Sequence, residues 1–405
     1  MSETLSLPRG FRFGAMSCGI KRSGAPDLAL VVADELVSVA AAFTSNRVQA
    51  APVLVSKEHV RRSGGRMRAV VMNSGNANCC TGKAGLAAAR SMAEGLAAKL
   101  FCRRDQVFIC STGVIGVPLP VEKILAGIPR LLPDIAAGPE AFARLSRGIL
   151  TTDTRPKTAS ASVRIGGRTA RIAGCTKGAG MIAPQFQGAH ATMLAFIFTD
   201  VAASPVLLRQ ALDAVVGPTF NSITVDGDTS TNDTVALFAG GASGATLASP
   251  RSQDFARFVR ALERVCHSLA LQIVADGEGA RHVIEIDVRG APDDRAAETV
   301  ARTIAHSPLV KTALAGADPN WGRILAAAGR SGVVFRPERA SITLAGVPVF
   351  RRGHPLPFDE KAAHEGMNQS QYVMLVDLKA GRGRARIWTC ELSEGYVRIN
   401  ADYRT

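Results

Sequence analysis

Strand-like and helix-like segments follow one another irregularly along this chain, and this mixture limits the fold more than any other feature. Short β-branched runs bounded by Gly or Asn predict strands over 27–32, 51–56, 68–73, 106–110, 193–198, 282–288 and 372–378. Alanine- or leucine-rich stretches with helical apolar spacing predict helices over 84–100, 205–216 and 254–273. Because hairpins as well as helices join neighbouring strands, we expect a layered α/β sandwich and no doubly wound parallel sheet.

The helix predicted over 205–216 has the clearest boundaries. Ser204 is a favourable N-cap, Pro205 suits the first helical position, and Gly217 follows the last apolar residue. The chain of 405 residues is long enough for two or three folding units around a large core. No internal repeat and no Pro- or Ser-rich linker marks a boundary between such units.

Composition and cysteine spacing predict a cytoplasmic protein. Hydrophobic residues make up 47% of the chain, yet no stretch reaches the ~18 apolar residues of a membrane helix. The first residues also lack the basic and then apolar pattern of a secretion signal. The eight cysteines include no C-x-x-C pair and no His at zinc spacing, so we expect reduced thiols and no metal site.

The net charge of +14 raises the alternative of a nucleic-acid partner. The arginines are dispersed, however, and the densest basic stretch, residues 61–68, contains no aromatic residue for base stacking. A solvated basic surface is therefore the preferred interpretation, and we expect no nucleic-acid binding.

One threonine lies at a junction where chemistry can occur. The glycine-rich stretch 177–184 predicts a loop, and the apolar run that begins at Thr192 predicts a buried strand. Taken alone, a threonine at the start of a strand is an ordinary structural residue. Its neighbours along the chain change that interpretation.

Ordered motifs occur on both sides of this threonine. They are Gly19–Lys21, Asn73–Asn78, Ser111–Gly116, Thr151–Thr154, Lys177–Ile182, Ala191–Leu194, Ile223–Thr234, Asp276–Ala280, Asp318–Arg323 and Tyr396–Thr405. With these motifs the chain resembles the ornithine acetyltransferase family over nearly its whole length. The resemblance implies an α/β sandwich of the self-processing type with an N-terminal threonine nucleophile.

The resemblance further implies self-cleavage between Ala191 and Thr192. Residues 1–191 would then form an N-terminal α chain, and residues 192–405 a β chain that begins with the nucleophile. The chemistry is sound, because the new α-amine has a reference pKa of about 7.7 to 8.0 and can act as general base for the hydroxyl of the same residue.

The remaining site residues also follow from the resemblance. Thr112 and Gly113 would form the oxyanion hole, although 111–113 alone would be read as a turn at the end of a strand. The substrate residues would be Thr151 (with Thr152 as the alternative), Lys177, Thr192, Glu278, Asn400 and Thr405. Lys177 suits a carboxylate ligand and Glu278 an ammonium group. The polar stretch 226–234 is interpreted as a network of turns and caps without a catalytic role.

The implied reaction moves an acetyl group from N2-acetylornithine to glutamate through an acetyl-Thr192 ester. It needs no bound cofactor, although acetyl-CoA is a second donor for some members, and the implied assembly is a heterotetramer of two α and two β chains. The segment Gln185–His190 is longer here than in the family, which leaves two alternatives open. One is a paralogue acting on another amino acid, and the other is a self-processing amidohydrolase.

Overall fold

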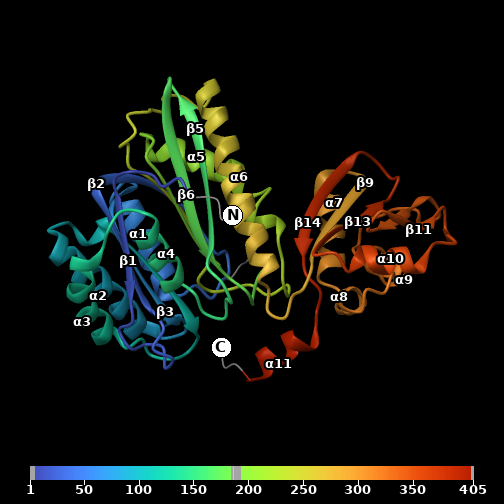
Figure 1. The fold of residues 1–405 in the computed structure, drawn as a ribbon, viewed down its shortest axis with the longest axis horizontal. Coiled ribbons are helices and arrows are strands. Elements are labelled where there is room, and N and C mark those ends of the chain that lie inside the picture. The colour runs from blue at the N-terminus through green and yellow to red at the C-terminus, as the bar shows by residue number, and fades with distance from the viewer. Residues whose placement is uncertain (1–4, 184–185, 187–192, 403–405) are drawn as a thin grey trace.

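The computed structural model describes residues 5–183, 186 and 193–402, which form two β-sheets with helices around them (Figure 1). The first sheet contains β1 (Phe11–Met16), β2 (Leu28–Phe43), β3 (Arg66–Asn76), β4 (Val107–Val114), β5 (Lys157–Ile165), β6 (Arg168–Lys177), β7 (Leu194–Thr199) and β8 (Thr234–Ala239). The second contains β9 (Val283–Ala291), β10 (Ser341–Leu344), β11 (Val347–Arg351), β12 (His354–Pro355), β13 (Gln371–Asp377) and β14 (Gly383–Thr389). The helices are α1 (Ala51–Arg62), α2 (Gly82–Leu100), α3 (Val121–Leu131), α4 (Pro139–Gly148), α5 (Pro205–Val216), α6 (Gln253–Ala275), α7 (Asp294–Ala305), α8 (Pro308–Ala315), α9 (Trp321–Gly329), α10 (Glu360–Met367) and α11 (Glu394–Asp402).

The long strand β2 links two halves of the first sheet. The strand order is β4-β3-β2-β8-β7-β6-β5, with β1 paired to β2. The first part of β2 pairs with β3, the part from Ser38 onward pairs with β8, and the register shifts between Val32 and Val37. The sheet thereby forms two layers. Figure 1 shows α1, α2 and α3 outside the β1–β3 side and α5 and α6 outside the β5–β6 side.

Strand β7 shows how the layers are held together. Phe196 and Phe198 belong to the core between the two halves of the sheet, whereas Ala195 and Ile197 pack into the core beneath α5 and α6. These four side chains are fully buried, which explains why the strand is a continuous apolar run instead of an alternating one. The architecture confirms the predicted layered α/β sandwich.

The second sheet has the order β12-β11-β10-β13-β9-β14 and a core of its own. Strand β9 lies next to the edge strand β14, to which it runs antiparallel, and it runs parallel to its other neighbour β13. After β14 the chain turns back, and Figure 1 shows α11 below the two sheets, pointing towards the first. The C-terminal helix therefore brings residues from the end of the chain to the first sheet.

Most predicted elements are confirmed, and one is wrong. The segment 51–56 is the start of α1 instead of a strand. Its residues Val53 and Val55 favour a strand locally, but Pro52 fits the first turn of a helix and both valines are buried, so packing prevails over local preference. Helix α5 has the predicted boundaries, and Ser204 Oγ accepts a hydrogen bond from the amide of Leu207.

Among the helices of residues 5–183 and 193–402, none combines the length and apolar character that a membrane span requires. Within the same residues, no cluster of three or more His, Cys, Asp or Glu side chains is arranged to hold a metal ion.

Candidate active site

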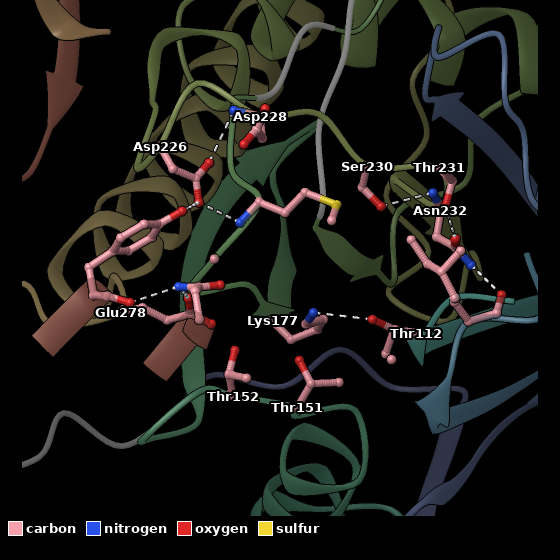
Figure 2. Close-up of a pocket in the computed structure, with 17 residues that line it drawn as sticks. Thr112, Thr151, Thr152, Lys177, Asp226, Asp228, Ser230, Thr231, Asn232 and Glu278 are labelled. Carbon is pink, nitrogen blue, oxygen red and sulfur yellow. Dashed lines mark hydrogen bonds between the residues drawn. The ribbon is translucent and has the colours of Figure 1, made fainter. Parts of the chain in front are cut away.

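A cavity of about 210 Å³ lies where β4 and β6 end and β8 begins (Figure 2). The predicted residues that line it are Thr112, Gly113, Thr151, Thr152, Lys177, Glu278 and Asn400. They come from segments far apart in the sequence and meet at one edge of the sandwich. The cavity is smaller than the ~300–1,000 Å³ typical of sites for drug-sized ligands, which suits a small metabolite.

Lys177 is the last residue of β6 and contributes a buried cation to the cavity. Its side chain is almost fully enclosed, and Nζ donates a hydrogen bond of 3.2 Å to Thr112 Oγ1 at the end of β4. Burial lowers the pKa of Lys177, and the nearby carboxylate of Asp153 acts in the opposite direction. A carboxylate ligand beside Lys177 would offset the cost of its burial.

Gly113 forms a stretch of cavity wall that no other residue type could form. Its φ is +130°, and a Cβ there would lie 2.4 Å from the carbonyl carbon of Gly75. Only glycine permits this backbone and this close approach of β3 to β4. Peptide groups without a covering side chain suit the binding of a developing oxyanion, which is the role predicted for Thr112 and Gly113.

Glu278 lies across the cavity from Thr112 and is held from two sides (Figure 2). Its amide donates to the carbonyl of Ala179 at 2.9 Å, and its carboxylate accepts a bond of 2.7 Å from Asn400 Nδ2. Gly180 is so close that a Cβ there would lie 2.3 Å from Glu278 Oε2. The C-terminal helix α11 therefore completes the site through Asn400. Thr405, the other predicted C-terminal residue, lies outside the described residues.

The polar stretch 226–234 is more than the predicted turn network. Asp226 does accept backbone hydrogen bonds, from the amides of Met181, Ile182 and Asp228. The cavity is also lined by Gly180, Met181, Asp226, Asp228, Ser230, Thr231, Asn232 and Tyr396, to which the sequence analysis gave no role. The signals in the sequence were the motifs that contain these residues and the density of polar groups in 226–234.

Asp226 and Tyr396 form an acidic part of the wall. The Tyr396 hydroxyl donates to Asp226 Oδ2 at 3.2 Å, and burial raises the pKa of Asp226 to about 6. Together with Glu278, this carboxyl group faces a cavity that also contains the cation of Lys177. Such a site complements a small ligand that carries both a carboxylate and an ammonium group.

Ala191 and Thr192, the predicted cleavage site, lie outside the described residues. The next residue is firmly held, because the Met193 amide donates to the Asp233 carboxylate and its carbonyl accepts a 3.0 Å bond from the Thr234 amide. Leu194 then pairs in register with Lys177. The start of β7 is thus anchored beside a residue that lines the cavity.

Within the segment Gln185–His190, the structure describes Phe186 alone. Its side chain is buried in the core beneath α5 and α6. Its amide donates to Asn221 Oδ1 at 2.6 Å, and Asn221 Nδ2 donates back to its carbonyl at 2.9 Å. Phe186, the described residue of this segment, is therefore fixed in the core.

Comparisons with known proteins cover almost the entire chain. Residues 12–405 match the model of the ArgJ family. The arginine biosynthesis bifunctional protein ArgJ of Chlorobaculum tepidum is 46% identical over 405 residues, covering 100% of this chain and 98% of its own. The protein of the same name from Thermus thermophilus is 48% identical, with 98% and 99% covered. A solved ornithine acetyltransferase of Mycobacterium tuberculosis, in complex with ornithine, is 38% identical with a TM-score of 0.40, covering 45% of this chain and 95% of its own.

Proposed function

We propose, because this chain belongs to the ArgJ family, that it is a self-cleaving acyltransferase of arginine biosynthesis. It moves an acetyl group from N2-acetylornithine to glutamate through an ester on Thr192, and gives ornithine and N-acetylglutamate. One observation carries the proposal. Of the residues predicted for substrate and oxyanion, those that the structure describes line one cavity, next to the strand that follows Thr192 in the sequence.

The first step is cleavage of the backbone. The Thr192 hydroxyl attacks the carbonyl carbon of Ala191, the new C–O bond replaces the peptide C–N bond, and the freed nitrogen takes a proton. Water then hydrolyses the ester, which leaves a carboxylate on Ala191 and a free α-amine on Thr192. The products are the chains 1–191 and 192–405. The anchoring of Met193 by Asp233 and Thr234 supports a fixed geometry on one side of the scissile bond.

Acetyl transfer then uses Thr192 twice. The α-amine takes the proton of the hydroxyl, whose oxygen attacks the acetyl carbonyl of the donor, and Thr112 and Gly113 hold the oxyanion. The proton passes to the leaving amine of ornithine. The amine of glutamate next attacks the ester carbon, the Thr192 oxygen leaves, and the hydroxyl regains its proton.

The charges of the cavity support amino-acid substrates. Lys177 pairs with a substrate carboxylate, and Glu278 pairs with an ammonium group, assisted by Asn400. Thr151, Thr152 and Thr405 complete the contacts in this proposal. No resident cofactor is needed, since the acetyl donor is itself a substrate, and acetyl-CoA is a second donor to be tested. The protein works in the cytoplasm as a heterotetramer of two α and two β chains.

Substitution of the nucleophile tests the proposal. Mass spectrometry of purified protein is expected to find one fragment ending at Ala191 and another starting at Thr192. Thr192→Ala is expected to remain one chain without acetyl transfer, and a cut or active variant would refute the assignment.

Assays with different substrates distinguish the proposal from its two alternatives. Purified protein is given N2-acetylornithine with and without glutamate. Formation of N-acetylglutamate supports the proposal, whereas acetate release at the same rate with and without glutamate would indicate an amidohydrolase. Absence of turnover in a fully cleaved protein would indicate a paralogue for another amino acid.

A further inference from the structure

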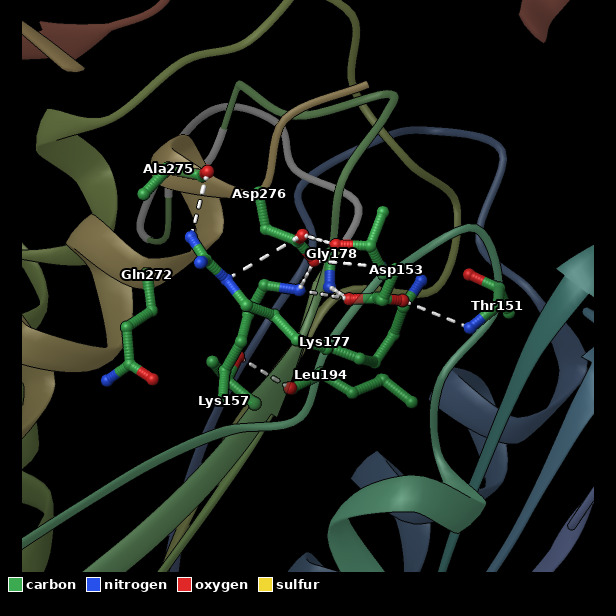
Figure 3. Close-up of polar contacts among 12 residues, drawn as sticks. Thr151, Asp153, Lys157, Lys177, Gly178, Leu194, Gln272, Ala275 and Asp276 are labelled. Atoms are coloured by element: carbon green, nitrogen blue, oxygen red, sulfur yellow. Dashed lines mark hydrogen bonds and ion pairs between the residues drawn. The ribbon is translucent and has the colours of Figure 1, made fainter. Parts of the chain in front are cut away.

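A second polar cluster lies directly behind the cavity, centred on Lys157 (Figure 3). Lys157 Nζ lies 2.6 Å from Asp153 Oδ1 and 2.5 Å from Asp276 Oδ2. The Lys157 side chain has 0% of its surface exposed, and its two partners have 0% and 3%. Lysine is almost never fully buried unless it is paired, and Lys157 satisfies this condition through its two ion pairs.

Asp153 connects Lys157 to two segments of the cavity wall. Its Oδ1 also accepts a hydrogen bond of 2.7 Å from the amide of Gly178, the residue that follows Lys177. Its Oδ2 accepts a bond of 3.0 Å from the amide of Thr151. One carboxylate therefore fixes the backbone beside Lys177 and the backbone of Thr151.

Asp276 connects the same lysine to a third segment. It precedes Glu278 by two residues in the turn that follows α6, and its carboxylate accepts from the amide (3.1 Å) and the hydroxyl of Thr154. The Thr151–Thr154 loop is thus held at both ends, by Asp153 and by Asp276. Figure 3 shows Lys157, Asp153, Gly178 and Asp276 converging at this point.

We propose that Lys157 is a positioning residue, which fixes Thr151, Lys177 and Glu278 relative to one another through its two ion pairs. Lys157, Asp153 and Asp276 are not among the described residues that line the cavity. They therefore act through their neighbours and not on the substrate. Stability alone gives no reason for such a cluster, since buried ion pairs are often replaceable by apolar residues without loss. Placement of the three substrate-facing segments does give one, because displacement of a binding group by 1 Å is enough to cost about 100-fold in rate.

The cluster also sets the charge around Lys177. The charged groups that act on Lys177 are Asp153, Lys157, Asp233, Glu278 and Lys21. After burial, which lowers the pKa of Lys177, the Asp153 carboxylate raises it and the Lys157 ammonium lowers it. Removing one charge or the other therefore shifts the titration of Lys177 in opposite directions.

The test uses full-length, self-cleaved protein and rests on the proposed function. Lys157→Met removes the cation at similar volume, and Asp153→Asn keeps the shape and one acceptor oxygen. Lys157→Met/Asp276→Asn removes the cation together with one carboxylate, so that only Asp153, and not both carboxylates, loses the charge of Lys157. Arg155→Met is the matched control, since Arg155 is 58% exposed and lies 3.9 Å from the same Asp276 carboxylate. Rates are normalised to the cleaved fraction found by mass spectrometry.

Kinetics and binding are measured as functions of pH. Lys157→Met and Asp153→Asn are expected to lower kcat/KM for N2-acetylornithine by about 10- to 100-fold, mainly through KM, and to weaken ornithine binding in calorimetry by a similar factor. The double variant is expected to recover part of this loss. The alkaline limb of kcat/KM is expected to move to lower pH in Asp153→Asn and to higher pH in Lys157→Met, and Arg155→Met to match the wild type.

Each outcome supports or overturns the positioning role. Normal KM, ornithine affinity and pH profile in folded Lys157→Met or in the double variant would overturn it, and so would shifts of equal size in Arg155→Met. If neither Lys157 variant folds, unchanged values in Asp153→Asn overturn it. A wild type that binds ornithine without transferring acetyl groups would reject the proposed function alone, and the ornithine affinities would still decide the positioning role.

Discussion

Substitution of Gly180 by alanine displaces the Glu278 carboxylate while residue 278 remains a glutamate. A Cβ at Gly180 would lie 2.3 Å from Glu278 Oε2, and contacts below 3.0 Å force a shift, so the carboxylate must move by about 0.7 Å or more. The carboxylate ends a flexible side chain, so the fold tolerates the movement at a cost of about 1 kcal/mol, mainly the lost bond from Asn400.

The effect on substrate binding is expected to be larger. A hydrogen bond to a charged group contributes about 1.5–3 kcal/mol, and its loss raises KM about 10- to 100-fold. We therefore expect Gly180→Ala to raise KM for N2-acetylornithine by this factor, while the urea midpoint changes little. Initial rates and equilibrium unfolding measure the two quantities on the same preparation.

The control is a glycine with free space around it. Gly329, the last residue of α9, has no atom within 4 Å of the position that a Cβ would occupy, so Gly329→Ala is expected to leave KM unchanged. If Gly180→Ala keeps a normal KM, Glu278 does not bind the substrate ammonium group and the charge assignment of the cavity is wrong. A large fall in stability would instead show that the Glu278 carboxylate is not free to move.

Three further predictions concern the core and the pH dependence. Phe198→Ala should lower the free energy of unfolding, measured in urea, by about 3–5 kcal/mol. The Phe198 ring is buried, and its centroid lies 5.2 Å from that of Phe11 and 5.4 Å from that of Phe238. A loss below about 1 kcal/mol would contradict this packing. Burial raises the pKa of Asp226 to about 6, so its negative charge is lost as pH falls through 6. The carboxylate then no longer attracts the ammonium group of N2-acetylornithine, so kcat/KM should fall there, and Asp226→Asn should lack this acid limb. Burial lowers the pKa of His306 to about 4, so below its ordinary pKa of 6.5 the unfolded state binds a proton that the folded state does not. The free energy of unfolding should therefore fall by up to about 3 kcal/mol from pH 6.5 to 4. The thermal midpoint of His306→Gln should not follow this trend.

Much of the fold was predictable because its strands are locally distinct. The run from Met193 to Phe198 is apolar on both faces, which already indicates a strand covered on two sides. The segment 51–56 failed because its valines carry a strand preference while their burial occurs in a helix. The second part of β2 was not predicted, since its pairing with β8 depends on a strand far away in the sequence.

The sequence indicated which residues belong to the candidate site, but it did not indicate how the fold brings them together. Lys177, Glu278 and Asn400 were proposed from motifs, yet no motif indicated that α11 turns back from the second sheet to place Asn400 on Glu278. The role of Gly180 was equally hidden, because it depends on a contact with a residue almost a hundred positions later. Long-range contacts of this kind are created by the fold.

The spacing within the motifs links the sequence to the buried cluster. In Thr151–Thr154 the cavity is lined by Thr151, and two residues later Asp153 is buried against Lys157. In Asp276–Ala280 the order is reversed, with Asp276 on Lys157 and Glu278 in the cavity. Each motif thus combines a residue that lines the cavity with a residue that fixes its own backbone. If this division is correct, exchanging Asp153 or Asp276 should impair binding through residues that stay chemically intact, which distinguishes a positioned site from a simple collection of ligand-binding side chains.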